Sequence, residues 1–134
     1  MDLASLDLTA AADRGADMHL EHPVSGAPLL TDAGEPITIR LLGNDSREFR
    51  AAIGELAEKQ AGKRRQSLDA AEAHSCELLA RLTTGWHGLV FNGETLSFTR
   101  ENAARLYRER PWIREQADRF IGDRGNFFKG GATA

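Results

Sequence analysis

Histidine is the residue type in this sequence that comes nearest to a metal-binding pattern. His19 and His22 are three positions apart, and an imidazole nitrogen is a common zinc ligand. The residues around them alternate between apolar and polar, as in a strand, and on a strand these two positions point to opposite faces. Two ligands also fall short of the four that structural zinc requires. We therefore expect no metal.

A cysteine and a histidine are also close together on a stretch with helical periodicity. His74 and Cys76 are two positions apart, so they face different directions on a helix and do not form a nucleophilic pair. Cys76 is better explained as a small buried hydrophobic residue. Because it is the single cysteine, no intramolecular disulfide can form, which favours a reducing compartment.

No other arrangement of residues supports catalysis. The two common glycine-rich phosphate loops, G-x-x-x-x-G-K-S/T and G-x-G-x-x-G, are absent from the sequence. Acidic pairs such as Glu101 with Glu109, or Asp118 with Asp123, are typical of any charged helix. The sequence thus predicts a protein that is not an enzyme and that uses no cofactor.

The elements that would position these residues begin with short strands. Apolar and polar residues alternate over residues 18–22 and again over residues 37–41, a pattern typical of strands. Turn-forming residues separate the two runs: Pro23, Gly26, Pro28, Gly34 and Pro36. A two- or three-stranded antiparallel sheet is predicted, and a sheet this small needs helices or another chain to cover one face.

Four helices are predicted after these strands. The first follows the cap candidates of residues 44–46 and stops or kinks near Gly62, and the second covers residues 68–82 and stops near Gly85. The third is capped by Thr99, and the fourth starts at Pro111. Between the second and third helices, Asn92-Gly93 favours a short hairpin, with a plain loop as the alternative.

The predicted fold class is therefore α+β, with a small antiparallel sheet near the N-terminus, about four helices, and helix dominant. The length of 134 residues fits one domain spanning residues 1–134. We expect a frayed N-terminus over residues 1–15 and a flexible C-terminal tail over residues 125–134. The hydrophobic share of 41% and the charged share of 28% exclude wholesale disorder.

Charge and hydropathy disfavour some partners. A formal net charge of −3 does not favour nucleic acid, because such binding depends on Lys and Arg that neutralise phosphates. No apolar stretch approaches the roughly 20 residues needed to cross a bilayer, and the start of the chain lacks a basic signal-peptide region. We therefore expect neither a membrane anchor nor export.

The aromatic residues are the remaining candidates for function. Trp112 and Phe120 lie on the most regular apolar helical stripe, where an ordinary core role is the main alternative to partner binding. Phe127 and Phe128 follow the last helix stop, next to Gly130-Gly131. This position predicts an exposed hook that another protein buries. The candidate protein-binding residues are thus Trp112, Phe120, Phe127 and Phe128.

Two parts of the chain resemble a known family. Residues 20–29 read L-E-H-P-x-S-G-x-P-L, and the last third contains F-T-x-E-N-A (98–103), P-W-I-x-E-Q (111–116) and F-I-x-D-R-x-N-F (120–127). These stretches are similar to the tail assembly chaperones of siphophages and prophages. The resemblance implies a protein that coats the tape measure protein, keeps its long apolar helices soluble and recruits the tail tube protein.

The resemblance also implies a place of action, the cytoplasm of the bacterial host, and absence from the mature virion. Two alternatives remain open: a structural minor tail or head-tail connector protein, and a small DNA-binding regulator that uses the basic residues 63–65 or 105–114. The sequence is also compatible with a homo-oligomer.

Overall fold

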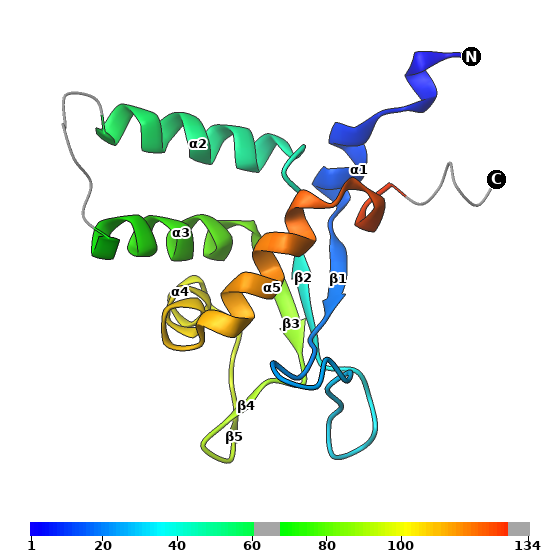
Figure 1. Ribbon diagram of the computed structural model, residues 1–134. Coiled ribbons are helices and arrows are strands. Elements are labelled where there is room, and N and C mark those ends of the chain that lie inside the picture. The colour runs from blue at the N-terminus through cyan, green and yellow to red at the C-terminus, as the bar shows by residue number, and fades with distance from the viewer. Residues whose placement is uncertain (61–67, 129–134) are drawn as a thin grey trace.

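Helices pack against one face of a small antiparallel sheet (Figure 1). The computed structural model describes residues 1–60 and 68–128. The sheet has the order β1-β2-β3, and a separate hairpin pairs β4 with β5. The strands are β1 (Ala16–His19), β2 (Thr38–Leu41), β3 (Thr83–His87), β4 (Val90–Phe91) and β5 (Glu94–Thr95). The predicted α+β class with helix dominant is confirmed, but the sheet is not confined to the N-terminal part.

The predicted alternation accounts for the two N-terminal strands. Met18 lies opposite Ile39 in the register of β1 and β2, and both side chains are buried, whereas Asp17 and His19 face outward and are exposed. Trp86 pairs with Ile39 from the other side, so β2 is the central strand. One face of the sheet is therefore apolar and must be covered.

The third strand is where the structure differs from the sequence prediction. The second predicted helix was expected to stop near Gly85, but it ends at Leu82, and β3 follows without an intervening turn. Thr83 explains the switch, because its hydroxyl donates to the Leu79 carbonyl at 2.7 Å and so satisfies a group at the helix end. Adjacent β-branched threonines then favour an extended backbone.

The helices begin where their caps predicted. Ser46 Oγ accepts a hydrogen bond from the Phe49 amide at 3.1 Å, Thr99 Oγ1 accepts one from the Asn102 amide at 3.0 Å, and Pro111 occupies the first turn of its helix. The predicted stop at Gly62 lies outside the described residues. The helices are α1 (Leu8–Arg14), α2 (Arg47–Gln60), α3 (Leu68–Leu82), α4 (Arg100–Glu109) and α5 (Pro111–Gly122), with two 3₁₀ turns, η1 (Leu3–Ser5) and η2 (Arg124–Asn126).

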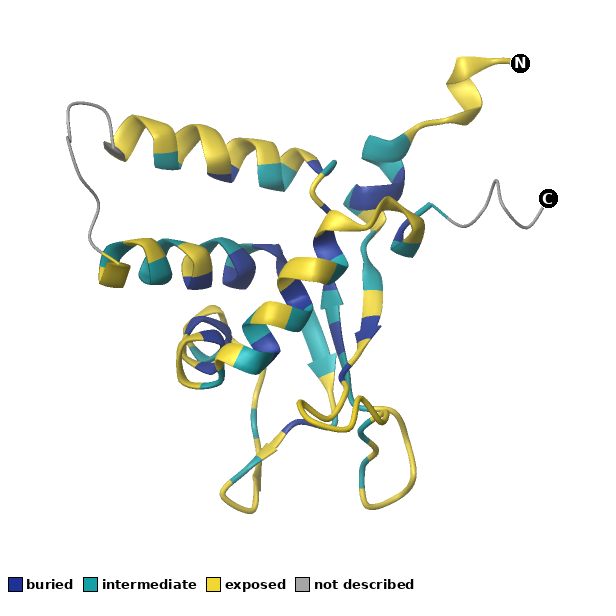
Figure 2. Ribbon diagram, viewed as in Figure 1, coloured by how far each residue is buried: buried dark blue, intermediate teal, exposed yellow. Residues whose placement is uncertain are grey.

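The core lies between the sheet and helices α3, α4 and α5, and Tyr107 is among its largest fully buried side chains. Helix α2 packs mainly along α3, so most of its surface remains exposed (Figure 2). The core accordingly occupies one part of the molecule, and the loops at the far end of the sheet are only partly covered (Figure 2).

Residues near both ends of the described chain pack against the body of the molecule. Helix α1 docks through Ala11 and Ala12, which are buried, and the Ala12 carbonyl accepts from the Gly43 amide at 3.3 Å. At the C-terminal end, η2 continues the chain to Asn126, and the amide of Phe128 donates to the Arg124 carbonyl at 3.0 Å. The frayed N-terminus over residues 1–15 and the flexible tail over residues 125–134 stay predictions. Residues 129–134 lie outside the described part.

Candidate binding pocket

An apolar pocket opens at the end of the sheet that carries the long loops, and its first wall is the connection between β1 and β2. Three backbone hydrogen bonds fix this wall: Leu20 N donates to Ile37 O at 2.9 Å, Ile37 N to Leu29 O at 3.0 Å, and Leu29 N to Leu20 O at 2.9 Å. The bridge between Leu30 and Pro36 closes the loop further out. The connection is therefore a folded unit that continues the sheet.

The second wall is the β4–β5 hairpin. Asn92 and Gly93 both have positive φ, 52° and 80°, as a type I′ turn requires, so the hairpin predicted from Asn-Gly is confirmed. Leu96 N donates to Leu89 O at 2.9 Å and extends the pairing. A Cβ on Gly88 would lie 2.6 Å from Thr31 Cγ2, so the glycine allows the two walls to meet.

The junction of α4 and α5 forms the third wall. Leu106, near the end of α4, and Ile113, in the first turn of α5, are both buried and line the inner part of the pocket. Pro111 ends one helix and begins the next, which turns the chain sharply and brings Arg110 and Trp112 to the same cavity.

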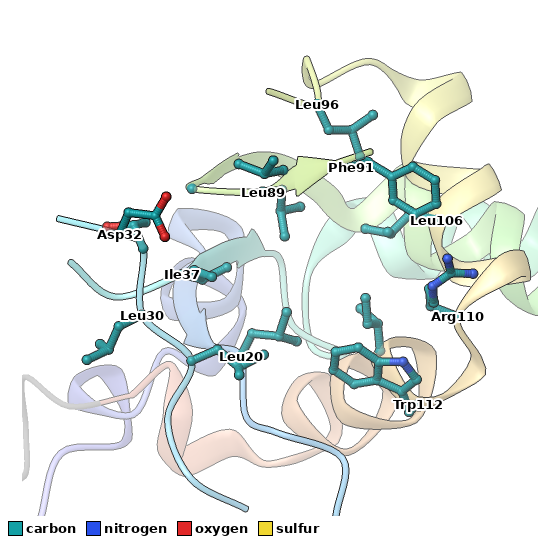
Figure 3. Close-up of a pocket in the computed structure, with 15 residues that line it drawn as sticks. Leu20, Leu30, Asp32, Ile37, Leu89, Phe91, Leu96, Leu106, Arg110 and Trp112 are labelled. Carbon is teal, nitrogen blue, oxygen red and sulfur yellow. The ribbon is translucent and has the colours of Figure 1, made fainter. Parts of the chain in front are cut away.

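The pocket enclosed by these walls has a volume of about 400 Å³ (Figure 3). Its lining is mostly aliphatic and aromatic, while Asp32 and Arg110 lie on opposite sides of the opening (Figure 3). Two aliphatic side chains at the pocket remain largely in water, since Leu30 is 55% and Val90 is 62% exposed. Concave apolar surface with few polar groups is typical of a binding site. This pocket is therefore the candidate functional site.

Arg110 is the charged group best placed to act on a ligand. Its guanidinium lies 4.9 Å from the centroid of the Phe91 ring, and its Nη1 donates to the Glu109 carbonyl at 2.9 Å. Within the described ranges no carboxylate pairs with it, whereas Arg114 and Arg124 each bind a carboxylate, of Glu72 and Asp45. An arginine fixed over an aromatic ring, with donors still available, can receive a carboxylate from a ligand.

The residues first considered for metal or nucleophilic chemistry take part in local hydrogen bonds or in the core. His22 Nδ1 accepts from the amides of Val24 and Ser25, and His19 Nε2 lies 3.2 Å from the Leu29 carbonyl oxygen. Cys76 is buried, as expected. Over residues 1–60 and 68–128, no group of three or more His, Cys, Asp or Glu side chains is arranged to hold a metal ion.

The four predicted protein-binding residues do not form one surface. Trp112 lines the pocket, but Phe120 packs edge-to-face against Phe127, with ring centroids 5.4 Å apart, toward the far end of α5. The prediction of an exposed hook is wrong for Phe127, because its side chain is only 9% exposed. Its ring also lies so close to Gly43 that a Cβ on this glycine would be 3.0 Å from the ring. Phe128 is half-buried.

Sequence reasoning missed most of the pocket. Leu30 and Val90 belong to very short apolar runs, Leu29-Leu30 and Leu89-Val90-Phe91, in turn-rich segments, and Arg110 resembles any helix-surface arginine. The signals that the sequence did contain were a proline break, an Asn-Gly turn and a proline-glycine loop, each beside a short apolar run. Only the folded structure brings these three segments together.

No helix in the described part of the chain combines the length and the apolar composition needed to cross a bilayer. Comparisons with family models, with curated proteins and with solved structures gave no match.

Proposed function

We propose that this chain binds another polypeptide through the apolar pocket and acts as a tail assembly chaperone without catalysing a reaction. The observation that supports the proposal is the open apolar pocket, with Leu30 and Val90 largely exposed beside it. The resemblance of residues 20–29 and of the last third supplies the identity of the partner, the tape measure protein, and of the recruited subunit, the tail tube protein.

The pocket is suited to side chains from one face of an apolar helix. A helix presents anchors at i, i+3, i+4 and i+7, and a groove of this kind receives two or three of them. Each buried aliphatic anchor contributes roughly 1.5–3 kcal/mol before the cost of ordering the partner. A long tape measure helix exposes many such anchors, so each copy of the chaperone would cover a short part of it.

The proposal also concerns location. A chaperone acts in the host cytoplasm while the tail forms and is then released. Mass spectrometry of purified particles should therefore not detect the chain, whereas stoichiometric presence would favour the structural alternative.

The test of binding is co-expression with the tape measure protein of the same genome, using two matched variants. Val90→Asp places a charge beside the pocket, and Val24→Asp makes the same change at a turn residue that is 89% exposed and outside the pocket. We expect the unmodified chain and V24D to keep the tape measure protein soluble and to co-purify with it, and V90D to lose both abilities.

Equal co-purification by V90D and V24D would show that the pocket is not the binding site. Both variants change a largely exposed side chain, so circular dichroism should show equal folding, and any difference can be assigned to the surface.

A further inference from the structure

The N-terminal arm, defined as residues 1–7, is exposed at every position and contains two leucines. It precedes α1 and projects away from the body of the molecule (Figure 1). None of its residues is buried, and Leu3 is 75% exposed although it is aliphatic. Leu6 is exposed as well. Apolar side chains displayed in this way indicate a contact with another surface.

The arm has a defined shape. Asp2 caps the η1 turn by accepting from the Ala4 amide at 2.9 Å, and the Leu6 amide donates to the Leu3 carbonyl at 3.0 Å. Leu3 begins this turn and Leu6 caps its end, so the two exposed leucines lie one 3₁₀ turn apart. Asp2 and Asp7 flank this pair, and the arm contains no basic residue.

We propose that the arm of one copy occupies the apolar pocket of a second copy until a partner polypeptide displaces it. The inference rests on the proposed function, because it assigns the resting occupant of the same pocket. The two surfaces match in chemistry: a pair of leucines meets an apolar cavity, and the flanking carboxylates lie beside Arg110, which has no carboxylate partner within the described ranges. Asp32 has the same charge as these carboxylates and lies across the opening from Arg110, so the arm's carboxylates belong on the Arg110 side (Figure 3).

The occupant comes from a second copy because the geometry prevents the chain from filling its own pocket. Residues of two loops line the pocket. The arm leaves the body beside α1, whereas these loops lie at the opposite end of the sheet (Figure 1). Helix α1 is docked through Ala11 and Ala12, so the arm cannot swing across the molecule without undocking it. The contact joins two different surfaces, and its occupancy must therefore rise with protein concentration.

The first test is light scattering over a range of concentrations on the full chain and two variants. L3S/L6S removes the apolar pair, and L68S removes an equally aliphatic, exposed residue at the start of α3, outside the arm and the pocket. The mean mass of the unmodified chain and of L68S should rise with concentration. Self-association of L3S/L6S should be weaker by roughly a hundredfold, because two leucines no longer become buried.

The second test uses a fluorescent peptide of residues 1–9 and the L3S/L6S chain, whose own arm cannot compete. Fluorescence anisotropy should show that the peptide binds to L3S/L6S saturably. Adding V24D to this chain should leave the binding intact, and adding V90D should abolish it. A concentration-independent monomer mass for the unmodified chain, or no peptide binding, would overturn the inference.

The experiments distinguish a failure of the proposed function from a failure of the proposed contact between copies. Binding of the tape measure protein by L3S/L6S, with loss on adding V90D, supports the proposed function even when the peptide does not bind. Peptide binding without any binding of the tape measure protein would contradict the proposed function and leave the contact between copies intact. When both hold, L3S/L6S should bind the tape measure protein more tightly than the unmodified chain does.

Discussion

Phe127 shows how a single aromatic residue can be misjudged from its position in the sequence. Its ring packs against Phe120 and closes over Gly43, so replacing it removes buried contacts. We expect Phe127→Ser to lower the free energy of unfolding by about 3 kcal/mol. Phe128→Ser should cost clearly less, because Phe128 is only half-buried. Denaturant unfolding followed by circular dichroism measures both, and equal stabilities would place Phe127 outside the core.

Tyr107 gives a second prediction at the residue scale. Burial raises the pKa of its phenol well above the ordinary value of about 10, and its hydroxyl lies 2.7 Å from Thr83 Oγ1 in the core. Above that ordinary value the unfolded chain loses the phenolic proton while the folded chain retains it, so stability should fall as the pH rises.

Tyr107 is the one tyrosine in the sequence, so tyrosinate absorbance reports on it alone. In an alkaline titration the tyrosinate band should appear together with the loss of the helical circular dichroism signal. Tyrosinate forming near pH 10, by that ordinary value, in a chain that keeps its helical signal would contradict the burial of the Tyr107 phenol.

At the scale of elements, the contact between the two loop walls depends on Gly88. Its φ is +84°, and a Cβ would clash with Thr31 at 2.6 Å, so Gly88→Ala should destabilise the fold by more than about 1 kcal/mol and separate the walls of the pocket. Gly54→Ala is the matched control, because Gly54 lies inside helix α2 with open space around it. Alanine there should stabilise the chain by roughly 0.5–1 kcal/mol. Thermal unfolding measures both effects, and equal shifts of the melting temperature in the two variants would contradict the role of Gly88.

The elements that the sequence predicted well are those with local signals. Ser46, Thr99 and Pro111 each mark a helix start through one side chain or ring, and Asn92-Gly93 fixes its turn through backbone preference alone. Strand β3 has no such signal, because it follows α3 directly and pairs with a strand more than forty residues earlier in the sequence. A short stretch of sequence contains no signal for pairing between strands that are this far apart in the chain.

The candidate site was harder to predict than the fold. Trp112 was predicted because it is a large aromatic residue on an apolar helical stripe, and it does line the pocket. Leu30, Val90 and Arg110 come from three separate segments and meet only after the chain has folded. Their types are ordinary, so the pocket is a property of the tertiary arrangement and not of a motif.

At the scale of the whole molecule, the chain separates a stabilising part from a part suited to binding. Helices α3, α4 and α5 bury the apolar face of the sheet, while the two loop walls and the α4–α5 junction leave a concave apolar surface at one end (Figure 3). The N-terminal arm carries complementary apolar groups at the other end. A protein built in this way can expose apolar surface for a partner without loss of its own stability.

Hydrogen–deuterium exchange with the proposed partner, the tape measure protein, tests the central claim most directly. The measurement uses the L3S/L6S variant, so that the arm does not compete, and compares amide exchange with and without the partner. Binding in the pocket predicts slower exchange over residues 29–37 and 88–96, and little change along α2. Protection confined to α2 and α3, or no protection at the loop walls, would contradict it.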